Sequence, residues 1–191
     1  MNRILSSAVK VAGSLAVIGG AVVAAAMPAS AAPPTRAWGI SAGGFIHINP
    51  VAEATVFNTP QVATSFLYPG FVTTSGILDR ASATEAFSQV GSPKVYLFSQ
   101  VDQLNASSVM STCRIGFFGT VGDTTIQAGS IKITGEPSIP LPRDPAINQH
   151  IFLPGITVTL NRQGVIAGIR TVTGIFISGF GQNLSIGVSR C

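Results

Sequence analysis

Charged side chains are scarce in this sequence, and their scarcity excludes several classes of protein. Lys, Arg, Asp and Glu together make up 9% of the 191 residues, whereas about 25% is usual for a soluble domain. The basic residues occur one at a time along the chain, so no patch that could follow a phosphate backbone is visible. We therefore expect no nucleic-acid partner, and we expect Ser, Thr, Asn and Gln to supply most of the surface polarity.

Residue types that bind metals or act in catalysis are also few. The only histidines are His47 and His150, and the seven acidic residues form neither a DxDxDG calcium loop nor an HExxH helix. A structural zinc site would need companion ligands that the chain does not offer. We therefore expect no metal and no other cofactor. Paired carboxylates that meet only in space, as in glycoside hydrolases, stay open as an alternative.

One short motif matches a hydrolase pattern. Gly39-Ile40-Ser41-Ala42-Gly43 has the G-x-S-x-G form of a nucleophile elbow, and Asp102 or Asp123 followed by His150 completes the chain order of such a triad. An elbow needs a parallel sheet before the serine and a helix after it, whereas Phe45-Ile46-His47-Ile48 alternates like a strand. We therefore expect no catalytic residue, and a secreted hydrolase is the least favoured function.

Long apolar runs are absent after Ala32, and the apolar stretch before it is typical of an export signal. A positive start is followed by the uncharged residues 11–23 and by the small-residue site Ala29-Ser30-Ala31. We predict a signal peptide over residues 1–31 and a single β-rich extracellular domain over residues 32–191. Two of the 11 basic residues would leave with the signal, so the formal net charge would fall from +4 to about +2.

No anchoring signal accompanies the predicted export signal. The cleavage site lacks a lipobox cysteine, and Leu153-Pro154-Gly155-Ile156-Thr157 differs from a sortase motif in the position of its threonine. We predict a secreted, extracellular protein without stable membrane insertion, and loose association with the cell wall is the alternative. A membrane-spanning barrel would need aromatic girdles, which one Trp and two Tyr can hardly supply.

Alternation with period two dominates the remaining sequence. Ile156 to Leu160, Ile131 to Thr134 and Leu184 to Ser189 alternate in this way, which predicts strands with one buried face. Further strands are predicted at residues 38–48, 52–57, 71–78, 84–90, 94–101, 106–118 and 165–177. Turn residues separate the strands, for example at Gly122-Asp123 and at Asn161-Arg162-Gln163-Gly164. We predict an all-β fold, an antiparallel β-sandwich, with a barrel-like fold or a β-solenoid as alternatives.

Proline is concentrated between Glu136 and Pro154. Proline lacks the N–H donor that a central strand needs and favours extended polyproline geometry. We therefore predict one long extended loop that crosses an end or an edge of the sheet. It is a candidate binding loop, and a plain crossover connection is the simpler interpretation.

Cys113 and Cys191 are the only cysteines. An even number of cysteines in an oxidising compartment usually indicates a disulfide. Neither cysteine lies in a CxxC arrangement or beside a histidine, as reactive thiols often do. We predict a Cys113–Cys191 disulfide that pins the last strand.

Several short blocks of the exported sequence form a recognisable pattern. They are Ala37-Trp38-Gly39-Ile40-Ser41-Ala42-Gly43-Gly44 with Ile48-Asn49-Pro50, a strand running into Cys113, residues 133–137, residues 151–161 and the ending Leu184 to Cys191. This pattern resembles the choice-of-anchor P family of secreted actinobacterial proteins. The resemblance implies a secreted or surface-displayed β-rich domain, includes the two cysteines as a pair, and supplies no activity or catalytic residue. The chain departs from the family in having Arg162-Gln163 where an acidic residue is common, and in its missing anchor.

These observations favour a secreted, non-catalytic structural or cell-surface-associated protein. Its partners would be a cell-wall polymer or surface proteins. The alternative is an extracellular ligand- or glycan-binding module, which would expose aromatic side chains on one face or around an open apolar cavity. The candidate ligand-contact residues are Trp38, Tyr68, Tyr96 and Phe180.

Overall fold

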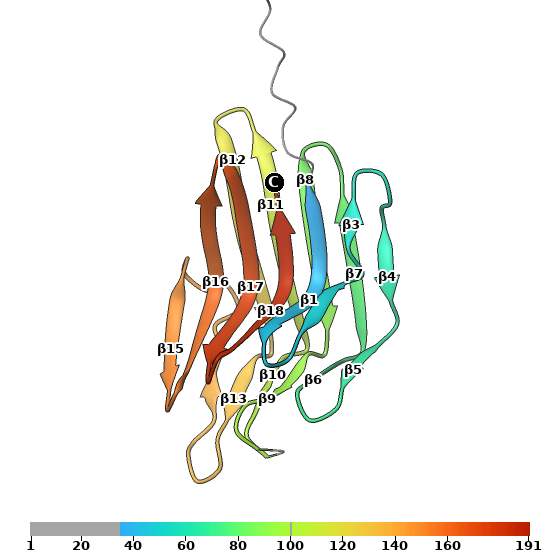
Figure 1. The fold of residues 1–191 in the computed structure, drawn as a ribbon. Coiled ribbons are helices and arrows are strands. Elements are labelled where there is room, and N and C mark those ends of the chain that lie inside the picture. The colour runs from blue at the N-terminus through green and yellow to red at the C-terminus, as the bar shows by residue number, and fades with distance from the viewer. Residues whose placement is uncertain (1–34, 100) are drawn as a thin grey trace, which may run out of the picture. The chain divides into compact units, whose positions relative to one another are not determined.

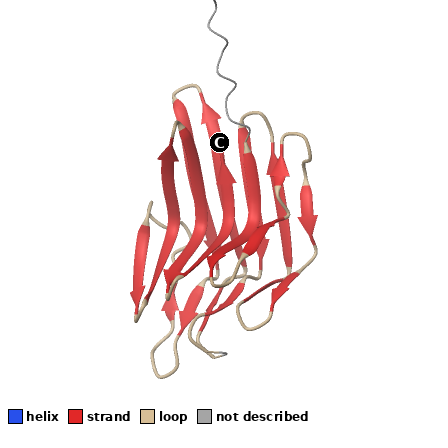
Figure 2. Cartoon of the chain, in the orientation of Figure 1, coloured by secondary structure: helices blue, strands red, loops and turns tan. Residues whose placement is uncertain are grey.

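Strands and their connections make up the described part of the chain, residues 35–99 and 101–191 of a computed structural model. Figure 2 shows strands joined by loops, and the described residues contain no helix. Accordingly, no helix in these residues is suited to cross a membrane. The signal peptide predicted over residues 1–31 lies outside the described residues.

The strands form three antiparallel sheets, which we call A, B and C. Sheet A has the order β15-β16-β17-β18-β1-β2, and β3 also pairs with β1. Its strands are β1 (Arg36–Gly44), β2 (Ile48–Val51), β3 (Ala54–Thr55), β15 (Gln149–Leu153), β16 (Ile156–Ile166), β17 (Ile169–Gly179) and β18 (Gln182–Arg190).

Sheets B and C are smaller than sheet A. Sheet B has the order β12-β11-β8-β7-β4 and sheet C the order β14-β13-β10-β9-β6-β5. The strands of sheet B are β4 (Gln61–Ala63), β7 (Gly76–Ala81), β8 (Glu85–Gly91), β11 (Ser108–Gly116) and β12 (Gly119–Gln127). Those of sheet C are β5 (Phe66–Tyr68), β6 (Val72–Thr74), β9 (Lys94–Tyr96), β10 (Gln103–Asn105), β13 (Ser130–Lys132) and β14 (Ile139–Pro140).

Sheets A and B are the two layers of a sandwich, and the short strands of sheet C lie at one end of it (Figure 1). Alternate residues of each layer face the interior, so the predicted period of two is what fills the core. Its largest fully buried side chains come from all three sheets and include Ile40, Leu104, Ile126, Leu160 and Ile186. The predicted antiparallel β-sandwich is therefore confirmed.

A disulfide joins the two layers. Cys113 lies on β11 of sheet B and Cys191 directly follows β18 of sheet A, and their Cα atoms are 5.7 Å apart. Around the bond, Ala37, Ala86 and Val172 complete a small buried cluster of their own. The predicted pairing is confirmed, and the bond ties the end of the last strand to sheet B. The backbone of Cys191 also exchanges two hydrogen bonds with Arg170 of β17.

Two segments predicted to be turns lie inside strands. Gly122 belongs to β12, and a Cβ at this position would lie 2.3 Å from Val172 of sheet A, so the glycine permits close packing between the layers. The chain actually turns at Phe117-Phe118, between β11 and β12. β16 likewise continues through Asn161, whose positive φ of 47° makes a local irregularity in the strand.

The predicted loop from Glu136 to Pro154 is shorter than expected because two strands interrupt it. β14 ends sheet C and β15 ends sheet A, so this segment connects the edges of two sheets. Its backbone is fixed by a hydrogen bond from the Ile126 amide to the Arg143 carbonyl and by one from the Asn161 side chain to the Pro145 carbonyl. The segment is therefore an ordered connection between sheets C and A.

Candidate ligand-binding cavity

A cavity of about 420 Å³ opens between one end of sheet A and sheet C. The volume lies in the range that small-molecule sites usually have. Its lining contains no charged residue and no histidine. The lining residues are Ile46, Gly70, Phe71, Val95, Tyr96, Leu97, Phe98, Ser99, Ile156, Ile177, Gly179, Phe180, Gln182 and Leu184. An uncharged, largely apolar and aromatic lining favours a neutral apolar ligand.

The cavity exists because the hairpin of β17 and β18 ends beside sheet C. Ile177 and Leu184 are inward-facing partners in this hairpin, and both contribute to the lining. Across the cavity, Val95 and Tyr96 come from β9, a central strand of sheet C. Strands β9, β16, β17 and β18 therefore supply half of the lining, and the loops beside them supply the rest.

Two exposed phenylalanines stand at the mouth of the cavity. The rings of Phe98 and Phe180 are edge to face, with centroids 6.2 Å apart. Phe180 and Gly181 are the two central residues of the β17–β18 turn, and their positive φ values of 47° and 69° are those of a type I′ turn. A phenylalanine in this conformation costs on the order of 1 kcal/mol, a strain that is more common at functional sites than elsewhere.

Phe180 is held in place by the neighbouring hairpin. A Cβ added to Gly155, in the turn between β15 and β16, would lie 2.4 Å from its ring. The absence of a side chain at Gly155 therefore makes room for the ring at the mouth.

Asp102 fixes the loop that carries Phe98. Its carboxylate accepts hydrogen bonds of 2.7 Å from the Thr134 amide and from the Ser99 hydroxyl, and its carbonyl accepts one of 2.9 Å from the Leu97 amide. The Thr134 amide is the main cause that lowers the pKa of this carboxyl, and Ser99 adds to it. We call residues 97–99 the lip of the cavity. The ionised form of Asp102 therefore ties this lip to Thr134, which follows β13.

Polar contacts at the cavity are few. The Gln182 side-chain oxygen accepts a hydrogen bond of 3.1 Å from the Ile46 amide, which ties the β1–β2 loop to β18. The Lys94 ammonium lies 5.1 Å from the centroid of the Tyr96 ring. Of these side chains, only Gln182 and Tyr96 line the cavity, and they are the polar groups that would orient a ligand with one polar end, whereas the apolar lining would hold the rest.

The structure brings together part of the predicted aromatic set. Tyr96 and Phe180 both line the cavity. Tyr68 stands just outside it, edge to face with the lining residue Phe71 at a centroid distance of 6.1 Å. Trp38 lies elsewhere, on β1 among a different group of residues that includes Arg162 and Ser185. Sequence reasoning did not single out Phe71 or Phe98, because their place in the cavity depends on how sheet C meets β17 and β18.

The residues of the hydrolase motif have other partners. The Ser41 hydroxyl accepts a hydrogen bond of 3.0 Å from the Trp38 indole. His150 is hydrogen-bonded to Thr159 at 3.0 Å, and the carboxylate of Asp102 is bound by the lip contacts. Asp123 lies on β12, opposite Thr112 of β11. Among the described residues, no group of three or more acidic, His or Cys side chains could hold a metal ion.

Asp79, which sequence reasoning missed, is a fully buried carboxyl between the layers. Burial raises its pKa from 3.8 to about 8, although the nearby Ser88 hydroxyl and Gly39 amide oppose the rise. Neither neighbour forms a well-aligned hydrogen bond with it, so both carboxyl oxygens lack a partner. Asp79 is not among the residues that line the cavity, and its burial bears on the stability of the fold.

The chain was compared with protein-family models, with curated proteins and with solved structures, and none of them matches it. The resemblance to the choice-of-anchor P family therefore stays a prediction.

Proposed function

We propose that this protein is a secreted, non-catalytic binding protein that holds a small apolar ligand between sheets A and C. The observation that carries the proposal is the cavity of about 420 Å³, with its uncharged lining and its mouth of Phe98 and Phe180. The disulfide is compatible with an oxidising, extracellular compartment. The structural or wall-associated role expected from composition stays a prediction.

The test is binding of a neutral fluorescent probe, N-phenyl-1-naphthylamine, to chain 32–191. We expect saturable binding with increased fluorescence, because the probe would move from water into an apolar site. Competition with straight-chain fatty alcohols and with polycyclic aromatic compounds would then separate an aliphatic ligand from an aromatic one.

A matched pair of tryptophan variants, one inside the cavity and one outside it, tests whether the probe binds there. Leu97 lines the cavity, whereas Leu67 lies exposed on β5 and outside the lining. Leu97→Trp should weaken probe binding at least about tenfold because its ring would occupy ligand space, and Leu67→Trp should change it by less than about twofold. Equal probe affinity in both variants, with both folded by circular dichroism, would contradict the proposed site.

A further inference from the structure

The end of the sandwich remote from the cavity exposes large apolar side chains on three separate loops. The side chains of Phe57, Phe117 and Phe118 are 92%, 97% and 101% exposed, and that of Ile166 is 82% exposed. Phe57 follows β3, the phenylalanine pair joins β11 to β12, and Ile166 ends β16. We call these four residues the apolar tips. Large apolar side chains exposed together at one end of a molecule point to an interaction site.

Strand pairing places these loops at the same end. Along sheet A, Thr55 of β3 is paired with Arg36, Arg36 with Arg190, and Arg190 with Thr171. Thr171 is two residues from the turn that Ile166 begins. The β11–β12 turn is joined to this row because the Arg170 guanidinium donates a hydrogen bond of 3.1 Å to the Thr120 hydroxyl. Figure 1 shows the three loops at the end opposite β9, β10 and β13.

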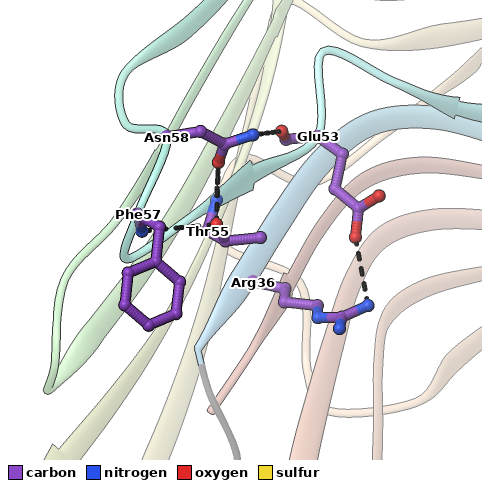
Figure 3. A network of polar contacts seen from close by, with 5 residues as sticks. All are labelled: Arg36, Glu53, Thr55, Phe57 and Asn58. Carbon is purple, nitrogen blue, oxygen red and sulfur yellow. Dashed lines mark hydrogen bonds and ion pairs between the residues drawn. The ribbon is translucent and has the colours of Figure 1, made fainter.

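The turn that carries Phe57 is held rigidly (Figure 3). The Asn58 side-chain oxygen accepts hydrogen bonds from the Thr55 amide at 2.6 Å and the Thr55 hydroxyl at 2.8 Å. The Asn58 amide group donates to the Glu53 carbonyl, and the Phe57 amide donates to the Thr55 hydroxyl. Only the backbone amide of Phe57 takes part in this network, and its ring is exposed to solvent. Its exposure is therefore fixed by the fold.

Three arginine residues lie on the strands a short distance behind the apolar tips. A strand advances about 3.3 Å per residue, which places Arg170 roughly 3 Å and Arg190 roughly 7 Å behind Ile169 at the β16–β17 turn. Arg114 is two residues, or roughly 7 Å, behind Gly116 at the β11–β12 turn. An apolar face that docks on a bilayer enters about 5–10 Å into the boundary between headgroups and acyl chains. The backbones of these arginines thus lie roughly 3–7 Å behind the turns, a separation that long side chains can span to reach lipid phosphates.

The charge balance at this end is positive. Arg36 and Arg114 are paired with Glu53 at 3.3 Å and Glu85 at 3.0 Å. In the described residues, no carboxylate is within ion-pair distance of Arg170 or Arg190. Asp123 is four residues from the start of β12, which places it roughly 13 Å behind the tip and beyond headgroup depth.

We propose that the apolar tips dock the protein reversibly on an anionic lipid surface. An ordered protein partner would need separate pockets that match three projecting loops, whereas fluid acyl chains accommodate such projections individually. Lipid phosphates complement the arginines that have no carboxylate partner. A docked molecule would present the cavity to the aqueous side. The proposal does not depend on whether the cavity binds a ligand.

The test is co-sedimentation of chain 32–191, which contains the whole described fold, with lipid vesicles. We expect binding to vesicles of equal parts phosphatidylglycerol and phosphatidylcholine to exceed binding to phosphatidylcholine alone by about tenfold or more. The double variant Phe117→Ser/Phe118→Ser should lose at least about tenfold of the partitioning to the anionic vesicles. Arg190→Gln should reduce the preference for the anionic vesicles severalfold.

Phe152→Ser is the matched control, because Phe152 is 77% exposed on the edge strand β15 and away from the apolar tips. It should keep its partitioning within about twofold of the parent chain. Absence of binding to both vesicles would overturn the proposal, as would equal losses in the double variant and the control. Sedimentation velocity without lipid tests whether a second copy of the chain covers the apolar tips instead. A dimer in the parent chain that the double variant abolishes would also overturn the lipid proposal.

Discussion

Asp79 and Ser88 face each other as partners in the β7–β8 ladder, yet the Ser88 hydroxyl donates its hydrogen bond across the sandwich to the Trp38 carbonyl, at 3.1 Å. The serine therefore links sheet B to β1 of sheet A and leaves the buried carboxyl without a well-aligned donor. A carboxyl in that position is held in its neutral form, since its charged form would lack both water and a partner. The burial of this one acid makes the stability of the fold depend on pH.

Asp79 should make the protein less stable as the pH rises. Its pKa is about 8 in the folded chain and about 4 in an unfolded one, so the folded state binds the extra proton between these values. The favourable contribution is complete below about pH 4, is lost between about pH 4 and 8 at up to about 1.4 kcal/mol per pH unit, and is absent above. Asp79→Asn should remove this dependence and raise the free energy of unfolding at pH 8.

Urea unfolding of the parent chain, Asp79→Asn and the exposed-site control Asp123→Asn at pH 5, 6.5 and 8 measures this effect. Asp123→Asn should keep the pH dependence of the parent chain. An Asp79→Asn variant that keeps the pH dependence of the parent chain would show that Asp79 is not the group responsible, and a parent chain equally stable at pH 5 and pH 8 would contradict the raised pKa of Asp79.

The lip contacts of Asp102 predict the opposite pH response. Because hydrogen bonds from Thr134 and Ser99 lower the pKa of this carboxyl, its stabilising contribution is present above its unfolded pKa, about 4, and is lost as the pH falls through its lower folded value. Asp102→Ala should free the lip, so the Thr134 and Leu97 amides should exchange their hydrogens faster at neutral pH. Hydrogen exchange measured by NMR checks this, and unchanged protection of both amides would refute the anchoring role.

The sequence predicted those parts of the fold that depend on local alternation. The alternation is regular in Leu184 to Ile186 of β18 and in Ile156 to Val158 of β16, where buried apolar residues alternate with partly exposed hydroxyl residues. The prediction of a turn was wrong where a glycine is needed for close packing between the two sheets. Gly122 has no side chain because Val172 of the other sheet occupies that space, a requirement set by tertiary packing.

The candidate site could be predicted only in part for a related reason. Tyr96 and Phe180 were two of the four aromatic residues named as candidate ligand contacts, and both line the cavity. The cavity itself depends on which strands pair in sheet C and on how that sheet meets β17 and β18. The pairings of β6 with β9 and of β10 with β13 skip over intervening strands, and the meeting of sheet C with β17 and β18 joins segments far apart in the chain, so no local pattern in the sequence reports them.

The disulfide should stabilise the domain substantially. It joins residues 78 positions apart, and the chain-entropy model assigns a loop of that length about 4.5 kcal/mol as an upper figure. The double variant Cys113→Ala/Cys191→Ala should therefore unfold at a clearly lower urea concentration, with the transition still cooperative. Unfolding of the parent chain with and without reductant gives an independent measure. A midpoint that neither treatment changes would show that the bond contributes nothing to stability.

Two glycines on one strand test how closely sheets A and B are packed. A Cβ on Gly39 would lie 2.3 Å from Ile77 of β7, whereas a Cβ on Gly43 would have no atom within 4 Å. Neither glycine has a positive φ, so alanine suits the backbone at both positions. Gly39→Ala should force the layers apart or displace Ile77 and destabilise the fold by about 1–3 kcal/mol. Gly43→Ala should be neutral or stabilise by up to about 1 kcal/mol, since alanine restricts the unfolded chain. Urea midpoints of the two variants measure the difference, and equal midpoints would mean that the layers can separate at no cost.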